Sequence, residues 1–278
     1  MVPLDPILGV EGVPQSATGQ TTLLTGINAQ ALLGQHLTGF PNAVLREILL
    51  ERSVLKILAD RGLRARFLNV YRPLFFELPR TRQLLLSATT VANLAAGNRF
   101  HDLADLRARR AIYQEFTNRD LRAKGYDVPE FTPAEAGRIL GRQAQRHDFL
   151  LFEYFQTDHA GHSQEWELAH RHLQRLEEFL TALLAELGGE GTTAEKSGFP
   201  EAAGAGKPDD QVADTLVVLT SDHGNIEDLT TKRHTCNPVP LMAWGPGAVA
   251  LTRDVRLLSD VTPALLHLLT GQDNHTVV

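Results

Sequence analysis

The chain has 278 residues, 43% of them hydrophobic, so it can bury a substantial core as one domain or one domain plus an insert. Its net charge is −6 and no run of Lys and Arg carries interleaved aromatic residues, which argues against a nucleic-acid partner. The single cysteine excludes an intrachain disulfide framework. No stretch approaches the roughly 18 apolar residues that span a bilayer, and residues 1–20 do not resemble a signal peptide. We expect a cytoplasmic protein with no membrane partner; the oligomeric state is left open.

The first half of the chain alternates helical and strand patterns. Val13 to Gly26 has the small residues of a helix start, and Ala43 to Asp60 reads as one helix. Arg66 to Tyr71 is a nearly continuous apolar run, as expected of a strand covered on both faces. Residues 73–129 lack strong strand signals and carry Arg-rich helical sequence. This region is either a small cap over a site or a set of peripheral helices.

The middle of the chain has the clearest signals. Thr132 to Arg146 opens as a helix with a capping box, Pro133 standing at the first helical position. Asp148 to Phe155 reads as a second strand. Ser163 to Leu187 reads as a long amphipathic helix ended by two glycines. Its predicted apolar face consists of Trp166, Ala169, Leu173, Leu176, Leu180, Leu183, Leu184 and Leu187.

The C-terminal part begins with a stretch of different composition. Residues 188–210 are rich in Gly, Ala and charge, which predicts a flexible surface loop. Thr215 to Thr220 and Pro240 to Trp244 read as two more strands. Strands that alternate with helices favour an α/β class with a mostly parallel sheet. We expect residues 1–72 and 131–278 to form one core and residues 73–130 a small helical insert or cap.

Two predicted strands run directly into potential metal ligands. Asp158 and His162 follow the second strand, and we expect a tight turn at Gly161 to aim both at one ion. Asp222 and His223 follow the third strand. Because ligand sites in parallel α/β sheets lie at the carboxyl ends of strands, the two pairs are expected to face the same site.

A turn at Gly224 and Asn225 would reorient Asp222 and His223, and His234 follows eleven residues after His223. A lone histidine near a strand end is more often an ordinary loop residue, but two Asp–His pairs with a third histidine are hard to obtain by chance. Carboxylate and imidazole donors together suit Zn²⁺ or Mn²⁺ better than Mg²⁺ or Ca²⁺. His159 stays ambiguous, since it neighbours Asp158 but points the other way.

The strings SDHGN, HTCNPVP and TDHAGH carry a family resemblance. They resemble the C-terminal signature of cofactor-independent phosphoglycerate mutases and the Asp-x-x-Gly-His motif shared with phosphopentomutases, all within the alkaline phosphatase superfamily. The resemblance implies a three-layer α/β/α core and a centre of two divalent ions, Mn²⁺ or Zn²⁺. It assigns Asp158, His162 and His234 to one ion and Asp222 and His223 to the other.

The nucleophile of these enzymes opens a helix near the N-terminus, and the resemblance places Ser16 at that position, with Thr18 as the second choice. The implied reaction is phosphoryl transfer on a small phosphate ester through a phosphoserine, ending as hydrolysis in a phosphatase or as transfer in a phosphomutase. The residues that would bind the remainder of the substrate stay unknown.

The chain departs from the family before Ser16. Family members start with a strand that ends in a metal-binding Asp, whereas residues 1–15 show no such pattern, and Asp5 reads as a loop residue. Either the sequence begins after that strand, which we favour, or the protein is a catalytically impaired metal-binding homologue. A metallohydrolase of another bond type is a third possibility, against which the serine-bearing stretch argues. The short insert makes hydrolysis somewhat more expected than mutase chemistry.

Overall fold

A computed structural model describes residues 1–188 and 214–271 of the chain. The predicted loop at 188–210 lies outside these residues except for Gly188, which caps a helix. The elements are β1 (Val2–Leu4), α1 (Ser16–Thr25), α2 (Ala29–Leu33), α3 (Ala43–Arg52), α4 (Val54–Asp60), β2 (Ala65–Phe67), α5 (Pro73–Phe76), α6 (Arg80–Gln83), α7 (Ala88–Ala95), α8 (Leu103–Arg107), α9 (Arg119–Ala123), α10 (Pro133–Ala144), β3 (Phe149–Leu151), α11 (Gln156–Ser163), α12 (Trp166–Leu187), β4 (Val217–Leu219), β5 (Val239–Trp244), α13 (Ala248–Asp254), a 3₁₀ turn η2 (Leu258–Asp260) and α14 (Val261–Thr270).

The described strands form two small sheets. β2 and β3 pair in parallel, whereas β1, β5 and β4 form an antiparallel sheet in that order. The expectation of a mostly parallel sheet is therefore wrong for these strands; the class is mixed α/β. The reason is local: the chain after β4 doubles back, with Thr235 N donating to Gly224 O at 3.1 Å, so β5 returns beside β4 instead of crossing over.

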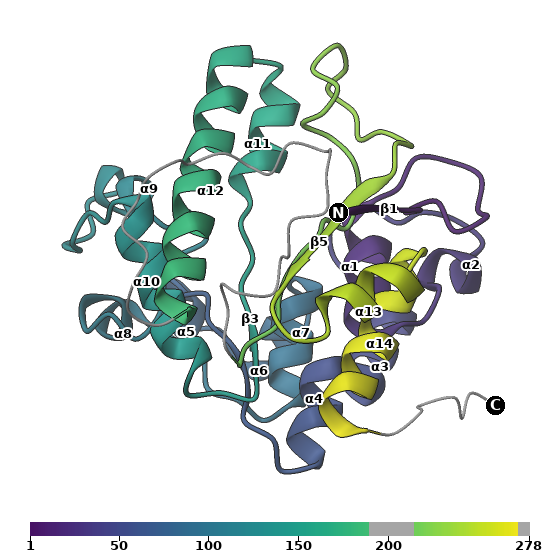
Figure 1. Cartoon of the computed structure of the whole chain (residues 1–278), viewed down its shortest axis with the longest axis horizontal. Helices are drawn as coiled ribbons and strands as arrows, with labels where there is room; N and C mark the ends of the chain where they lie inside the picture. The colour runs from purple at the N-terminus through teal and green to yellow at the C-terminus, as the bar shows by residue number, and fades with distance from the viewer. Residues whose placement is uncertain (189–213, 272–278) are drawn as a thin grey trace.

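Helices cover both faces of β3 (Figure 1). Leu150 packs with the cluster formed by α10, α12 and residues 103–131. Phe149 and Leu151 pack with the cluster formed by α3, α4, α7 and part of α14. This alternation is the period of two of an extended chain, and it fixes which strand residues face which helix layer.

The long helices pack by close backbone approach. A Cβ at Gly137 of α10 would lie 2.2 Å from the Phe179 carbonyl oxygen of α12, so only glycine fits there. The capping box of α10 is confirmed: Thr132 Oγ1 accepts from Glu135 N at 3.1 Å, and Glu135 Oε2 accepts from Thr132 N at 2.9 Å.

The predicted apolar face of α12 is partly wrong. Trp166 is 72% exposed and Leu173 47% exposed, while Phe179 and His172 are buried in their place. The surfaces that pack against α12 determine which of its residues are buried. Phe179 stacks on Phe116 with ring centroids 4.6 Å apart, and only part of α12 contacts α10.

Other predicted elements exist with different bounds. All four predicted strands are present; the first three are shorter than predicted, and β5 begins one residue earlier, at Val239. The helix expected over 43–60 is interrupted at Ser53, whose backbone is extended. β1 was not predicted, because its three residues include a proline, which suits only an edge strand.

The region expected as an insert consists of short helices, α5 to α9. Residues such as Leu106, Phe116 and Phe131 share one apolar cluster with α10 and α12. The division into a core and a cap stays a prediction. Among residues 1–188 and 214–271, no helix combines the length and the apolar content needed to cross a bilayer.

Candidate metal centre

Asp158 and His162 lie one turn apart on α11 rather than in the expected tight turn. Residues four apart share a helix face, so Asp158 Oδ1 and His162 Nε2 approach to 3.4 Å. Gly161 has another role than the one predicted, since a Cβ there would lie 1.6 Å from Asn225 Oδ1. The glycine lets the chain after β4 reach α11.

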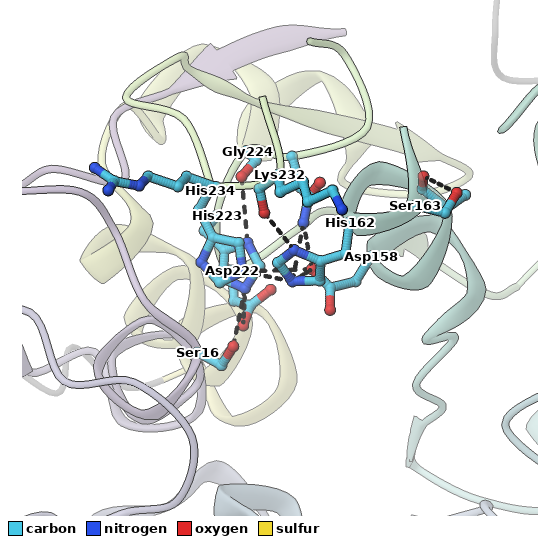
Figure 2. Close-up of polar contacts among 12 residues, drawn as sticks. Ser16, Asp158, His162, Ser163, Asp222, His223, Gly224, Lys232 and His234 are labelled. Atoms are coloured by element: carbon cyan, nitrogen blue, oxygen red, sulfur yellow. Dashed lines mark hydrogen bonds and ion pairs between the residues drawn. The ribbon is translucent and has the colours of Figure 1, made fainter. Parts of the chain in front are cut away.

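His234 comes from the loop before β5 and completes a three-residue group. Its Nε2 lies 3.2 Å from His162 Nε2 and 3.5 Å from Asp158 Oδ1 (Figure 2). One donor atom from each residue lies within 4.8 Å of the others. Among the described residues, this is the one group of three such side chains found close enough to hold a single metal ion.

The tautomers of the two imidazoles are set by backbone carbonyl groups. His162 Nδ1 lies 2.6 Å from Lys232 O, and His234 Nδ1 lies 3.0 Å from Pro14 O, so each Nδ1 carries the proton it donates. The two Nε2 atoms then face each other and Asp158, an arrangement that requires a proton or a cation between the two nitrogen atoms. A carbonyl behind a ligating histidine is the usual support of a metal site.

The charges of this group reinforce one another. Burial acts to raise the pKa of Asp158, but the hydrogen bond with His234 and the nearby histidine charges outweigh it and bring the pKa down to about 2. Burial acts to lower the pKa of His234, yet its hydrogen bonds to Asp158 and Pro14 raise it. Asp158 is therefore a carboxylate at neutral pH, in the form a cation requires.

Ser16, Asp222 and His223 lie next to this group (Figure 2). Ser16 is the first residue of α1, and its Oγ lies 3.0 Å from His223 Nε2. The His223 ring stacks on His234 with centroids 3.6 Å apart, which joins the two halves of the centre. Thr18 is fully buried and its hydroxyl bonds to Gln15 O, so it faces away from this chemistry.

The carboxyl group of Asp222 has fewer hydrogen-bond partners than that of Asp158. Its Oδ2 is buried without a hydrogen-bond partner in the described part of the chain, 3.5 Å from His223 Nε2. Burial raises the pKa of Asp222, against the opposing charge of His223. The Asp222 backbone also touches α1, because a Cβ at Gly19 would lie 2.4 Å from its carbonyl oxygen.

The sequence reading missed Asn225, which it treated only as a turn residue. Asn225 is 5% exposed, and its Nδ2 donates to Asp158 Oδ1 at 2.7 Å. Glu227 in turn accepts from Asn225 N at 2.7 Å and from the hydroxyl of Thr235. The sequence contains one signal, since Asn225 lies two residues after His223, but its partner Asp158 on α11 is 67 residues away.

Comparison with known proteins agrees with this geometry. Residues 210–272, which include Asp222, His223 and His234, match the family model described as Metalloenzyme superfamily. Together with the relatives below, this match supports the alkaline-phosphatase-like metalloenzyme assignment that the motifs predict.

The relatives are 2,3-bisphosphoglycerate-independent phosphoglycerate mutases. The chain is 30% identical to that of Halobacterium salinarum over 167 residues, which is 55% of this chain and 28% of that protein. It is 28% identical to that of Natronomonas pharaonis over 213 residues, 70% of this chain and 37% of that protein. The matches thus cover well under half the length of either relative. A solved structure of the PH0037 protein from Pyrococcus horikoshii aligns with 80% of this chain and 53% of its own at 14% identity, with a TM-score of 0.45, too low to support a common fold.

Proposed function

We propose that this chain is a metal-dependent phosphoryl-transfer enzyme that acts on a small phosphate ester through Ser16. The observation that carries the proposal is the convergence of three imidazole Nε2 atoms and two aspartates on one centre, with a serine hydroxyl 3.0 Å from one of them. Metal ligands alone would fit many hydrolases. The serine at the edge of the ligand set favours covalent phosphoryl transfer.

We propose two divalent ions in this centre, and Mn²⁺ or Zn²⁺ suits its mixture of imidazole and carboxylate donors. Asp158, His162 and His234 would hold one ion; Asp222, His223 and Ser16 would hold the other. Ions bound there would lower the pKa of the Ser16 hydroxyl and neutralise charge on the phosphate oxygens.

Ser16 has a second source of electrostatic support. It is the first residue of the ten-residue helix α1, so the phosphoryl group it receives would lie at a helix N-terminus, where the macrodipole favours negative charge. In the proposed step, a bond forms between Ser16 Oγ and phosphorus while the ester oxygen leaves with its electron pair. Water then takes the phosphoryl group in a phosphatase, or a second hydroxyl of the substrate takes it in a phosphomutase.

The curated relatives are mutases by name, but the chain covers 37% or less of the two compared above. Because the segment between Ser16 and Asp158 leaves room for only a short insert, we propose hydrolysis ahead of isomerisation. We also propose a cytoplasmic location and no nucleic-acid or membrane partner. A catalytically impaired homologue that binds metal is the second candidate. It is favoured by the single complete three-ligand group found among the described residues.

The test is phosphatase activity on an aryl phosphate with added Mn²⁺ or Zn²⁺. Ser16→Ala should reduce kcat by at least about 10³-fold, because it removes the nucleophile. Ser163→Ala is the matched control: this serine lies on α11 beside His162, and its hydroxyl donates to Ala160 O and accepts from Glu165 N. Acid quenching followed by mass spectrometry should find a phosphate on the Ser16 peptide. Tight metal binding without turnover and without phosphoserine would favour the impaired homologue.

A further inference from the structure

The ligand loop, residues 224–237 between β4 and β5, contains an acidic residue, Glu227, that is not among the proposed ligands. Glu227 Oε2 accepts from Asn225 N at 2.7 Å. Glu227 Oε1 accepts from the Thr235 hydroxyl and, at 3.1 Å, from Asn237 Nδ2. Although Glu227 is an exposed residue, both of its carboxylate oxygens thus bind donors from the two ends of one loop.

The two ends of the ligand loop also meet through their backbones. Thr235 N donates to Gly224 O at 3.1 Å. A Cβ at Gly224 would lie 2.6 Å from Glu227 Oε1 and would also clash with the Thr235 hydroxyl. The missing side chain of Gly224 therefore leaves the space in which the carboxylate and the hydroxyl meet. Because this glycine follows His223 directly, the closure of the loop lies next to a proposed ligand.

Between its closed ends, the ligand loop contacts both ligands on α11. Asn225 Nδ2 donates to Asp158 Oδ1 at 2.7 Å, and Lys232 O lies 2.6 Å from His162 Nδ1. The loop itself supplies the third member of the group, His234. Each of the three ligands is therefore either held by the loop or part of it, so the shape of the loop determines where the three donor atoms lie.

Asp228, the next residue along the chain, is an acid of the same loop with only a local contact. Its Oδ1 accepts from Thr230 N at 3.0 Å and from Thr230 Oγ1 at 2.6 Å, two residues further on. Glu227 instead reaches Asn237, ten residues away. Loss of either acid removes one negative charge near the centre, but only the loss of Glu227 opens the loop.

We propose that Glu227 is a positioning residue for the metal centre. By closing the ligand loop, its carboxylate holds His234, and the groups that fix Asp158 and His162, in the arrangement that binds one divalent cation. The inference rests on the proposed metal centre and deepens it. Glu227 is not grouped with the three ligands, and the loop donors occupy its oxygens. Ligands that are already in place bind an ion more tightly, so opening the loop should weaken the ion although no ligand is lost.

Metal binding by three variants tests the proposal, with Mn²⁺ as the probe in calorimetry and electron paramagnetic resonance. Glu227→Ala removes the closure. Glu227→Gln keeps one oxygen for Asn225 N, and its amide can donate to Thr235 Oγ1, so the loop should stay closed. Asp228→Ala is the matched control, since it removes the same charge from the same loop. The first ion is the one at Asp158, His162 and His234, and the second is the one at Asp222, His223 and Ser16.

We expect two Mn²⁺ per chain in the wild type. In Glu227→Ala the first ion should bind about 10- to 100-fold more weakly and the second less than about threefold more weakly. In Asp228→Ala and Glu227→Gln both ions should stay within about fivefold of the wild type, because the loop remains closed.

An unchanged first ion in Glu227→Ala overturns the role of Glu227 and leaves the proposed function standing. Equal weakening in Glu227→Ala and Asp228→Ala, or in Glu227→Ala and Glu227→Gln, overturns it as well, because the loss of charge would then explain the effect. Loss of both ions together in Glu227→Ala would show a general role in folding and would also overturn it. The expected pattern in a chain without phosphatase activity supports the positioning role and counts against the proposed function alone.

Discussion

Asp158 and Asp222 lie in the same polar centre, yet their surroundings shift the pKa values of their carboxyl groups in opposite directions. Asp158 accepts from Asn225 and faces two histidines whose far nitrogens are fixed by carbonyl groups, and its pKa falls to about 2. Among the described residues, Asp222 Oδ2 is buried without a hydrogen-bond donor and the Glu153 side chain bonds only to Thr89, and the pKa of both carboxyl groups is raised. The Asp158 half is therefore organised by hydrogen bonds within the described part of the chain, and we expect the Asp222 half to depend on bound charge.

Removing His234 should have the largest effect, because this residue completes the organised half. We expect His234→Ala to weaken the first Mn²⁺ by on the order of 10³-fold, since one of three protein ligands is lost. The second ion should weaken too, because the His234 ring stacks on His223. Calorimetric titration measures both. His170→Ala, an exposed histidine on α12, is the control, and an equal loss there would show that the effect is not local.

Glu153→Gln should change how stability depends on pH by a few kcal/mol. The pKa of Glu153 is about 8 in the folded chain against an ordinary 4.5, so folding favours the protonated acid. Its contribution to stability is complete below about pH 4.5 and is lost as pH rises through 8. In the presence of a chelator, the variant should therefore unfold at higher urea than the wild type at pH 8, and similarly to it at pH 4.5.

Glu115→Gln also removes an acid with a raised pKa, so its stability should become less dependent on pH as well. If Glu153→Gln left the pH dependence of unfolding unchanged, burial would not raise the pKa of the Glu153 carboxyl group.

The strand-end rule located most of this centre from the sequence, because ligand type and position are both local properties. Asp158 and Asp222 each follow a strand that could be recognised along the chain, whereas Ser16 was placed by the family resemblance. Glu153 and Asn225 could not be found this way. The carboxyl group of Glu153 bonds to Thr89 on α7, and the amide of Asn225 bonds to Asp158 on α11. Such roles depend on which segments pack together.

Prediction of the fold from the sequence has the same limit. The capping box of α10 is a contact between residues three apart, and it was predicted to the residue. The direction of β5 depends on the path of the loop after β4, and the buried face of α12 depends on where Phe116 lies. Hydrophobic spacing alone placed Trp166 in the core, although it is 72% exposed.

Gly161→Ala should lower the free energy of unfolding by about 1–3 kcal/mol, because the new methyl group would displace the Asn225 side chain from the Asp158 half of the centre. Urea unfolding with chelator present gives the value. The double variant with Asn225→Gly isolates the cause. In that background, alanine should be neutral or stabilising by up to about 1 kcal/mol, since it favours helix more than glycine does. A full penalty in both backgrounds would mean that the clash is with something other than Asn225.

Asn225→Ala should have the smallest effect and the most specific one. It removes the 2.7 Å donor to Asp158 Oδ1 without touching a ligand, so the first Mn²⁺ should bind about tenfold more weakly. The Asp158 carboxyl would then resemble that of Asp222, with an oxygen short of a donor, and its pKa should rise from about 2. Asn98→Ala is the control, because its amide bonds to Ala65 O within the β2 region. Unchanged Mn²⁺ affinity in Asn225→Ala would show that the histidines alone organise Asp158. The contrast between the two halves would then come from their imidazoles and not from hydrogen bonding around the carboxylates.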